Sequence, residues 1–251
     1  MNPDELIHRI YETRSVVGRS GEAHYLHSEV DHEEGALLFN TIRDDLRIVE
    51  TLEVGCGFGL SSLHICKALH GRTKASHTIV DPFQMTQWDG AGVKNLEEAG
   101  ITFFNLLELR SEFALPRILE QAEGKFDFIF IDGWHTFDHT LLDCFYATRL
   151  LRVGGYLAID DVIFDAVRRV VDFLLNYPCY ELFRSLGRVK SKSWKRLGAR
   201  TVLSLTPARI QAELFSRRVG RWIFEDSDLR MVVLKKTSED ARDWDWHDDR
   251  F

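Results

Sequence analysis

Short apolar runs alternate along this chain with longer segments of helical period. Five runs have the length of strands and are rich in β-branched or aromatic residues: Val49–Val54, His77–Val80, Thr102–Leu106, Phe126–Ile131 and Tyr156–Ile159. The segments between them carry apolar residues three and four apart, which predicts helices over Ser61–Leu69, Trp88–Ala99, Glu112–Glu120 and Phe137–Leu151. This alternation predicts βαβ units, in which right-handed crossovers place helices on both faces of a parallel sheet.

The flanking segments extend the same pattern. Apolar periodicity predicts helices over Asp4–Thr13 and Glu33–Leu46, so we expect residues 1–47 to form an N-terminal helical segment. Downstream, the sequence predicts an amphipathic helix and two strands that close the sheet edge: Ile163–Leu175, Cys179–Ser185 and Asp228–Lys235. The expected fold is α/β, a doubly wound, mostly parallel seven-stranded sheet of Rossmann-like type in a single domain spanning residues 1–251.

Charge is distributed unevenly. The 251 residues have a formal net charge of −7, yet Arg184–Arg221 contains eleven Lys or Arg and one acidic residue. We expect a basic insertion at residues 186–227, between the last two strands, and an acidic tail at residues 237–251. A solvated insertion is the default interpretation, and a lid or a site for an acidic acceptor is the alternative. Aromatic residues are few in the insertion and the whole protein is acidic, which disfavours a nucleic-acid partner.

The expected compartment and the state of the cysteines are inferred from the absence of membrane-span, signal-peptide and CxxC patterns in the sequence. No apolar run approaches the roughly 20 residues of a membrane span, and Met1–Ile10 has no signal-peptide pattern. We therefore expect a cytoplasmic protein with no membrane partner. The four cysteines form no CxxC pair, which argues against a disulfide framework and a structural zinc site. A homo-oligomer is compatible with these features.

A glycine-rich loop follows the first predicted strand of the βαβ pattern. The segment Glu53–Gly59 reads EVGCGFG, and its glycines would let the backbone approach a ligand closely. In the dinucleotide fingerprint the third glycine comes three positions after the second, whereas here it arrives one residue early. Asp81 follows the second strand, where an acid can accept hydrogen bonds from ribose hydroxyls. Steric needs of a turn are the alternative explanation for both features.

This loop resembles the first motif of the class I S-adenosylmethionine-dependent methyltransferases. The resemblance implies that the cofactor S-adenosyl-L-methionine contacts Glu53, Gly55, Gly57, Gly59 and Asp81. It also implies a contact between the adenine region and Ser111, which could instead be the N-cap of the following helix.

Three further acids end the fourth and fifth predicted strands. Asp132 follows one strand, and Asp160 and Asp161 follow the next. Because parallel strands open their carboxyl ends on one edge, we expect these side chains to converge. Like-charge repulsion makes such a cluster costly without a cation, and oxygen ligands suit Mg²⁺, Ca²⁺ or Mn²⁺. A magnesium site is the expectation, and carboxylates that cap nearby helices are the alternative.

The same strand ends resemble those of the catechol O-methyltransferase-like enzymes and of methyltransferase family 24. The resemblance lies in Ile131–His135 (IDGWH), Leu151–Gly155 (LRVGG) and Ala158–Val162 (AIDDV), within a match from about Glu33 to about Leu175. It implies Asp132, Asp160 and Asp161 as metal ligands, with Asp132 also beside the cofactor.

His135 stands where family 24 carries a catalytic histidine, and it is the general-base candidate because imidazole exchanges a proton near neutral pH. An exposed histidine at a helix start is the alternative. In the catechol-type enzymes the second residue of the strand-five pair is asparagine, so Asp161 favours the bacterial, sugar-modifying branch.

These features predict an enzyme that transfers a methyl group from S-adenosylmethionine to a hydroxyl of a small molecule, such as a sugar, a catechol-like compound or a glycosylated metabolite. Two other classes stay open. An NAD(P)-dependent oxidoreductase is disfavoured by the glycine spacing. A noncatalytic adenosyl-binding protein of the same fold is disfavoured by His135 beside three acids.

Overall fold

The computed structural model describes residues 1–187 and 228–247, and its centre is one seven-stranded sheet. The strand order is β5-β4-β3-β6-β7-β9-β8. Neighbouring strands from β5 to β7 are parallel, and β9 runs antiparallel to both β7 and β8. The strand bounds are β3 Glu50–Val54, β4 Ser76–Val80, β5 Phe104–Leu107, β6 Phe126–Ile131, β7 Leu151–Ile159, β8 Tyr180–Leu186 and β9 Met231–Lys236. The predicted mostly parallel, seven-stranded α/β fold is confirmed.

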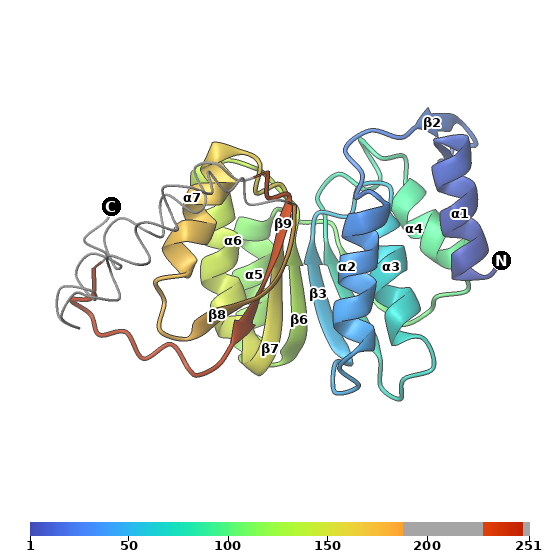
Figure 1. Ribbon diagram of the computed structural model, residues 1–251. Coiled ribbons are helices and arrows are strands. Elements are labelled where there is room, and N and C mark those ends of the chain that lie inside the picture. Colours follow the sequence, from blue (N-terminus) through green and yellow to red (C-terminus); the bar gives the residue numbers. More distant parts are fainter. Residues whose placement is uncertain (188–227, 248–251) are drawn as a thin grey trace, which may run out of the picture.

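Helices cover both faces of this sheet (Figure 1). One face packs against α1 Pro3–Thr13, α2 His32–Arg43, α3 Leu60–Leu69 and α4 Ala91–Glu98. The other face packs against α5 Ser111–Ala122, α6 Phe137–Leu150 and α7 Asp165–Leu174. Side chains of β6 alternate between two buried clusters, with Phe128 and Phe130 on the α1–α4 side and Ile129 and Ile131 on the other. A strand buried on both faces explains the continuous apolar run of β6.

Helix α2 begins with a capping box that fixes an acidic side chain at the edge of the sheet. The Asp31 carboxylate accepts hydrogen bonds from the backbone N–H groups of Glu33 (2.8 Å) and Glu34 (3.0 Å). The Glu34 carboxylate accepts one in return from the Asp31 N–H, at 2.8 Å. Gly35 then lets α2 approach α3, because a Cβ at this position would lie 2.3 Å from His64 Nε2.

Three local features differ from the sequence expectations. Residues 1–47 contain a two-stranded hairpin, β1 Ser15–Val17 and β2 Ala23–Tyr25, whose three-residue strands are too short to show alternation. Helix α4 begins at Ala91, since Gly90 turns the chain in the left-handed region (φ 63°). Strand β7 begins five residues before Tyr156. Its glycines are part of the strand, and a Cβ on Gly155 would lie 2.8 Å from the Asp127 carbonyl oxygen.

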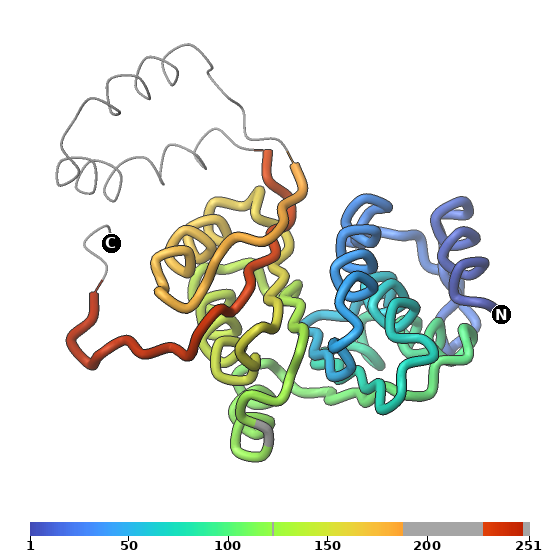
Figure 2. Tube along the Cα trace, turned by 60° about the horizontal axis from the view of Figure 1, so that its bottom comes forward, coloured from blue at the N-terminus to red at the C-terminus, as the bar shows by residue number. Residues whose placement is uncertain are grey.

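The chain after β9 lies on the α7 side of the sheet, far from the N-terminal helices (Figure 2). Trp246 packs edge-on against Tyr177 (5.7 Å between ring centroids), and the Arg242 guanidinium lies 3.3 Å from the centroid of Tyr177. The described part of the acidic tail is thus docked on the fold through aromatic contacts. The basic insertion lies almost entirely outside the described residues. Within residues 1–187 and 228–247, no helix has the length and apolar character needed to cross a membrane.

A buried lysine joins the last strand, β9, to the junction of α6 and β7. Lys236 is only 2% exposed, and its Nζ donates hydrogen bonds to the carbonyl oxygens of Thr148 (2.9 Å) and Leu151 (2.8 Å), where α6 passes into β7. Its third partner is the Glu239 carboxylate, at 2.8 Å. The ammonium group therefore supplies a charged donor to two buried carbonyl oxygens.

Replacing Lys236 with Met should lower the free energy of unfolding by about 1–3 kcal/mol, because two buried carbonyls lose their charged donor while the volume is nearly kept. Urea denaturation at pH 7 measures this change. The matched control is Lys235→Met, a half-buried lysine on the other face of the same strand, with its Nζ 5.9 Å from the Tyr156 ring centroid. It should change stability by less than about 1 kcal/mol, because it loses only this cation–π contact. Equal stabilities of the two variants would contradict a structural role for the buried amine.

Candidate active site

A cavity of about 670 Å³ opens at the carboxyl ends of the parallel strands. Its walls come from the loops that follow β3, β4, β5, β6 and β7, together with the start of α2. Ligands of doubly wound sheets bind at this edge, near the point where the strand order reverses, which here lies between β3 and β6. The cavity therefore lies where this fold class places its ligands.

Glycine is required for different physical reasons at the three glycine positions of the loop after β3. All three have positive φ: 89° for Gly55, 52° for Gly57 and 82° for Gly59. A Cβ on Gly55 would lie 2.0 Å from the Asp132 carbonyl oxygen, and one on Gly59 would lie 2.8 Å from the Gly92 Cα. A Cβ on Gly57 would meet nothing closer than Trp88, at 4.0 Å. Gly55 and Gly59 thus allow close packing, and Gly57 leaves free space beside the cavity.

The Asp81 carboxylate holds this loop in place from the end of β4. It accepts hydrogen bonds from the backbone N–H groups of Cys56 (3.1 Å) and Gly57 (3.0 Å), and from that of Phe83 (2.9 Å). Asp81 is buried and also lines the cavity. Oδ2 also accepts a hydrogen bond from the Gln84 amide (3.1 Å), whereas the bond from Phe83 ends on Oδ1. The turn and the ligand-facing interpretations of Asp81 are therefore compatible only through Oδ1, which retains a lone pair.

Glu53 lies behind the loop and does not line the cavity. Its side chain is fully buried, with Oε2 3.0 Å from Nε2 of His77 and in a hydrogen bond with the Ser62 hydroxyl. The His77 ring in turn lies 2.9 Å from the Thr51 hydroxyl. The structure therefore places Glu53 in a polar network that joins β3, β4 and α3. No sequence signal indicated His77 as its partner, because the two residues meet only through strand pairing.

Ser111 lines the cavity as the first residue of α5, one position after the N-cap Arg110. It is therefore inside the helix, so the N-cap alternative does not hold. On the opposite wall, Phe58 and Trp88 pack edge to face, with centroids 5.0 Å apart. This aromatic wall gives the cavity an apolar side.

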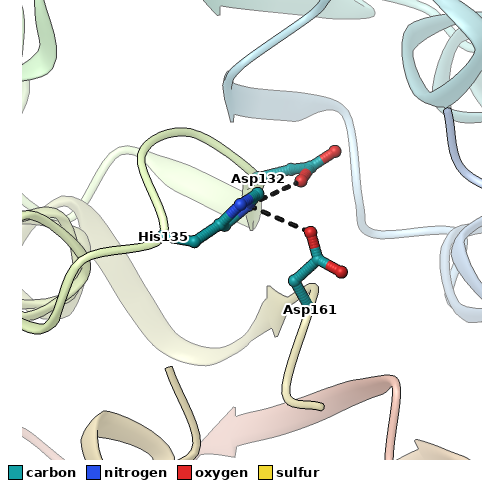
Figure 3. A group of neighbouring side chains, drawn as sticks. All are labelled: Asp132, His135 and Asp161. Carbon is teal, nitrogen blue, oxygen red and sulfur yellow. Dashed lines mark hydrogen bonds and ion pairs between the residues drawn. The ribbon is translucent and has the colours of Figure 1, made fainter. Parts of the chain in front are cut away.

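A histidine and two aspartates meet at the other end of the cavity (Figure 3). His135 Nε2 lies 3.3 Å from Asp132 Oδ1 and 3.2 Å from Asp161 Oδ2. One ligand atom from each of the three side chains lies within 4.8 Å of the others. Asp161 has a left-handed backbone conformation (φ 54°), which aspartate tolerates better than most residues. This turn directs its carboxylate toward His135.

Asp160 has a different position from that of Asp161. Its Oδ1 accepts a hydrogen bond from the Asp161 backbone N–H at 2.8 Å, and its side chain is buried in the cavity wall. Burial and then repulsion from Asp132 raise its pKa well above the usual value. Burial and then repulsion from Asp161 raise the pKa of Asp132 in the same way. A cation among these groups would relieve the repulsion.

Two cavity residues had no place in the sequence predictions of the site. Phe164 stacks on the His135 ring, with centroids 5.6 Å apart and planes inclined by 25°. Glu34 lines the cavity from the first turn of α2, and burial raises its pKa. Acidic residues are common in the first turn of a helix, so its position in the sequence did not indicate a ligand. Phe164 comes three residues after the Asp160-Asp161 pair, and no sequence pattern distinguished it from an apolar residue of the core.

Fold and site together define a class I methyltransferase, with a glycine loop after the first parallel strand, an acid after the second and a polar cluster after the fourth and fifth. Residues 52–162 match the family model Methyltransf_24, described as a methyltransferase domain. The predicted class I S-adenosylmethionine-dependent methyltransferase is confirmed. No curated protein matches the chain.

Solved structures of methyltransferases have the same fold. TomG, an O-methyltransferase from Streptomyces achromogenes in complex with SAM, is 17% identical with a TM-score of 0.61, covering 94% of this chain and 89% of its own. An O-methyltransferase from Bacillus cereus in complex with SAH is 14% identical with a TM-score of 0.62, covering 93% and 90%. The SAH-bound Podospora anserina methyltransferase PaMTH1 is 16% identical with a TM-score of 0.57, covering 94% and 88%. At these identities the similarity shows the fold.

Asp81→Asn should weaken S-adenosylhomocysteine binding at least tenfold. The substituted amide group brings N–H donors against the N–H groups of Cys56 and Gly57, so the loop loses its acceptor and the cavity loses a charged hydrogen-bond acceptor. Isothermal titration calorimetry measures the dissociation constant. Asp89→Asn is the matched control, because Asp89 binds Ser20 in the N-terminal hairpin and does not line the cavity. Equal affinities for the two variants would exclude Asp81 from the binding site.

Proposed function

We propose that this protein is an O-methyltransferase that acts on a hydroxyl group of a small molecule, with a divalent cation at its site. The observation that supports the proposal is the cluster of Asp132, His135 and Asp161 in the same cavity as the glycine loop. A methyl donor held at the loop and a hydroxyl held at the cluster would face each other across one cavity. Such positioning is the main requirement of a one-step transfer between two bound groups.

In this proposal one set of residues binds the cofactor and another serves the acceptor hydroxyl. S-Adenosylmethionine supplies an activated methyl group on its sulfonium. Gly57 gives its backbone room to approach, Asp81 accepts hydrogen bonds from the ribose, and Ser111 lies near the base. His135 accepts the proton that the acceptor hydroxyl loses during transfer, since neutral imidazole is a base near pH 7. The Phe164 ring, stacked on His135, holds the imidazole plane in place.

The donor atoms fit a divalent cation. Asp132 and Asp161 offer carboxylate oxygens close together at the cavity wall, and the buried Asp160 adds negative charge behind them. Two carboxylates and open positions suit Mg²⁺, whereas a histidine ligand in the set would favour Mn²⁺ or a later metal. In our proposal Asp132 and Asp161 hold the cation and His135 stays free to accept a proton. The cation would supply a Lewis acid that lowers the pKa of a hydroxyl.

The rim beside the cluster fits an acceptor with an apolar face. Trp134 and Phe164 line the cavity next to the acidic cluster and are each at least half exposed. Exposed large apolar side chains at a cavity mouth are typical of ligand contact. TomG, described as taking part in tomaymycin synthesis, is an O-methyltransferase of the same fold and is consistent with a small-molecule acceptor. The oxidoreductase alternative is weaker, because both the family match and the glycine spacing favour methyl transfer.

Asp161→Asn should reduce methyl transfer at least a hundredfold while S-adenosylhomocysteine affinity stays within about threefold, because this carboxylate serves the acceptor end of the cavity. Removal of divalent cations with EDTA should have the same effect on the wild-type protein, and added Mg²⁺ should reverse it. Turnover is measured with radiolabelled cofactor over a panel of phenols, catechols and sugars. The control is Asp165→Asn, an exposed aspartate on α7. Full turnover in excess EDTA would contradict the role of the cation.

His135→Asn should lower the rate of methyl transfer by about 10²- to 10⁴-fold, the usual effect of losing a general base. The variant should also lose the increase of rate with pH that a general base of the imidazole type produces near neutrality. Calorimetric titration with Mg²⁺ distinguishes a general base from a metal ligand at position 135, since removal of a base leaves the cation affinity unchanged. His70→Asn, at the exposed end of α3, is the control. A large loss of Mg²⁺ affinity in His135→Asn would make His135 a ligand.

A further inference from the structure

A buried glutamine contacts the glycine loop without lining the cavity. Gln84 is fully buried in the turn that follows β4. Its Nε2 donates hydrogen bonds to the Gly57 carbonyl oxygen (2.7 Å) and to Asp81 Oδ2 (3.1 Å). The Gly57 N–H donates to the same carboxylate oxygen, at 3.0 Å. These three residues therefore close a ring of hydrogen bonds that joins the end of β4 to the loop after β3.

The direction of the Gln84 amide is determined by its two neighbours. A carbonyl oxygen and a carboxylate can only accept hydrogen bonds, so the NH₂ group of the amide must face both of them. The Gln84 Oε1 is then left without a hydrogen-bond partner among the described residues. A Cβ on Gly92 of α4 would lie 2.9 Å from this oxygen. A buried amide oxygen without a partner is costly, and an apolar side chain would avoid that cost. The two donated hydrogen bonds therefore explain why a glutamine occupies this position.

The two oxygens of Asp81 differ in what they can still accept. Oδ2 receives the N–H groups of Cys56 and Gly57 together with the Gln84 amide. An oxygen has two lone pairs, so three donors leave Oδ2 no capacity for a ligand. Among the residues that the structure describes, Oδ1 receives the Phe83 N–H alone, at 2.9 Å, and it retains one lone pair. Since Asp81 lines the cavity, a ligand can add one hydrogen bond to this carboxylate.

We propose that Gln84 is a positioning residue for the ribose of the cofactor: it holds the Asp81 carboxylate and the Gly57 carbonyl in one ring, so that Asp81 accepts a single ribose hydroxyl, through Oδ1. This inference rests on the proposed function in that an S-adenosyl compound binds in this cavity with its ribose at Asp81. It adds a residue that acts through Asp81 without touching the ligand, and it limits the carboxylate to one of the two ribose hydroxyls.

A second buried amide provides a comparison for this role. Asn95 of α4 is 2% exposed, and its Nδ2 donates a hydrogen bond to the Phe58 carbonyl oxygen at 2.9 Å. Asn95 thus holds the same loop one residue beyond Gly57, but it is not among the described donors to Asp81. Loss of Asn95 should loosen the loop alone, whereas loss of Gln84 should loosen the loop and the carboxylate together.

The first test measures how much each ribose hydroxyl contributes to binding by the wild type. Calorimetric titration gives the dissociation constants of S-adenosylhomocysteine and of its 2′-deoxy and 3′-deoxy analogues. We expect one analogue to bind about tenfold or more weakly than the parent compound, because it loses a hydrogen bond to a charged acceptor. The other analogue should bind within about threefold of the parent compound. Equal losses for the two analogues would overturn the inference.

The second test repeats these titrations with two variants. Gln84→Met removes both donated hydrogen bonds at nearly the same volume, and it should weaken binding of S-adenosylhomocysteine. The factor lost with the sensitive hydroxyl should also fall to about threefold or less, because Asp81 is no longer held in one orientation. Asn95→Leu should weaken binding too, yet retain the factor that the wild type shows for that hydroxyl.

Thermal melting confirms that each variant is folded. If Gln84→Met is not, Gln84→Asn replaces it, because its amide is one methylene too short to bridge both acceptors. The same factor for the sensitive hydroxyl in the wild type and in the folded Gln84 variant would overturn the positioning role, as would an equal fall of that factor in Asn95→Leu. Failure of the wild type to bind S-adenosylhomocysteine would instead contradict the proposed function.

Discussion

The glycine loop and the cavity of this protein depend on the close approach of two backbone segments at the centre of the sheet. Gly55, after β3, lies against the carbonyl of Asp132, after β6, with no room for a Cβ between them. The loop that continues from Gly55 is held by the Asp81 carboxylate from the neighbouring strand. Parallel pairing of β4, β3 and β6 brings these three strand ends together. The cavity exists because the loop is drawn back against the sheet at this point.

Electrostatics at the site follow from the same arrangement. Strand ends that open on one edge place Asp132, Asp160 and Asp161 near one another. Burial and the repulsion between neighbouring carboxylates raise the pKa values of Asp132 and Asp160. Clustered carboxylates destabilise the folded state, so a purely structural core avoids them. Such clusters are typical of sites that bind a cation or move a proton. The His135 imidazole between two of these carboxylates fits the same interpretation.

The polar groups behind the cavity form a second layer. Glu53 and His77 pair beneath the glycine loop, and Asp143 is buried on α6. None of the three lines the cavity, and Glu53 binds the hydroxyl of Ser62, next to the cavity residue Ser61. Buried side chains of this kind influence a ligand by fixing the position of the segment that lies in front of them.

The sequence by itself determined the order of strands and helices, because strand runs such as Phe126–Ile131 are continuously apolar and the crossover helices have a clear period. It also predicted that Gly57, Asp81, Asp132 and Asp161 share one edge, since strand ends of a parallel sheet must meet there. Only the tertiary structure decided which neighbours these residues have. It directed Glu53 to His77, placed His135 rather than Asp160 between Asp132 and Asp161, and stacked Phe164 on His135. Such choices depend on side-chain direction and on packing between segments far apart in the chain, which no local pattern records.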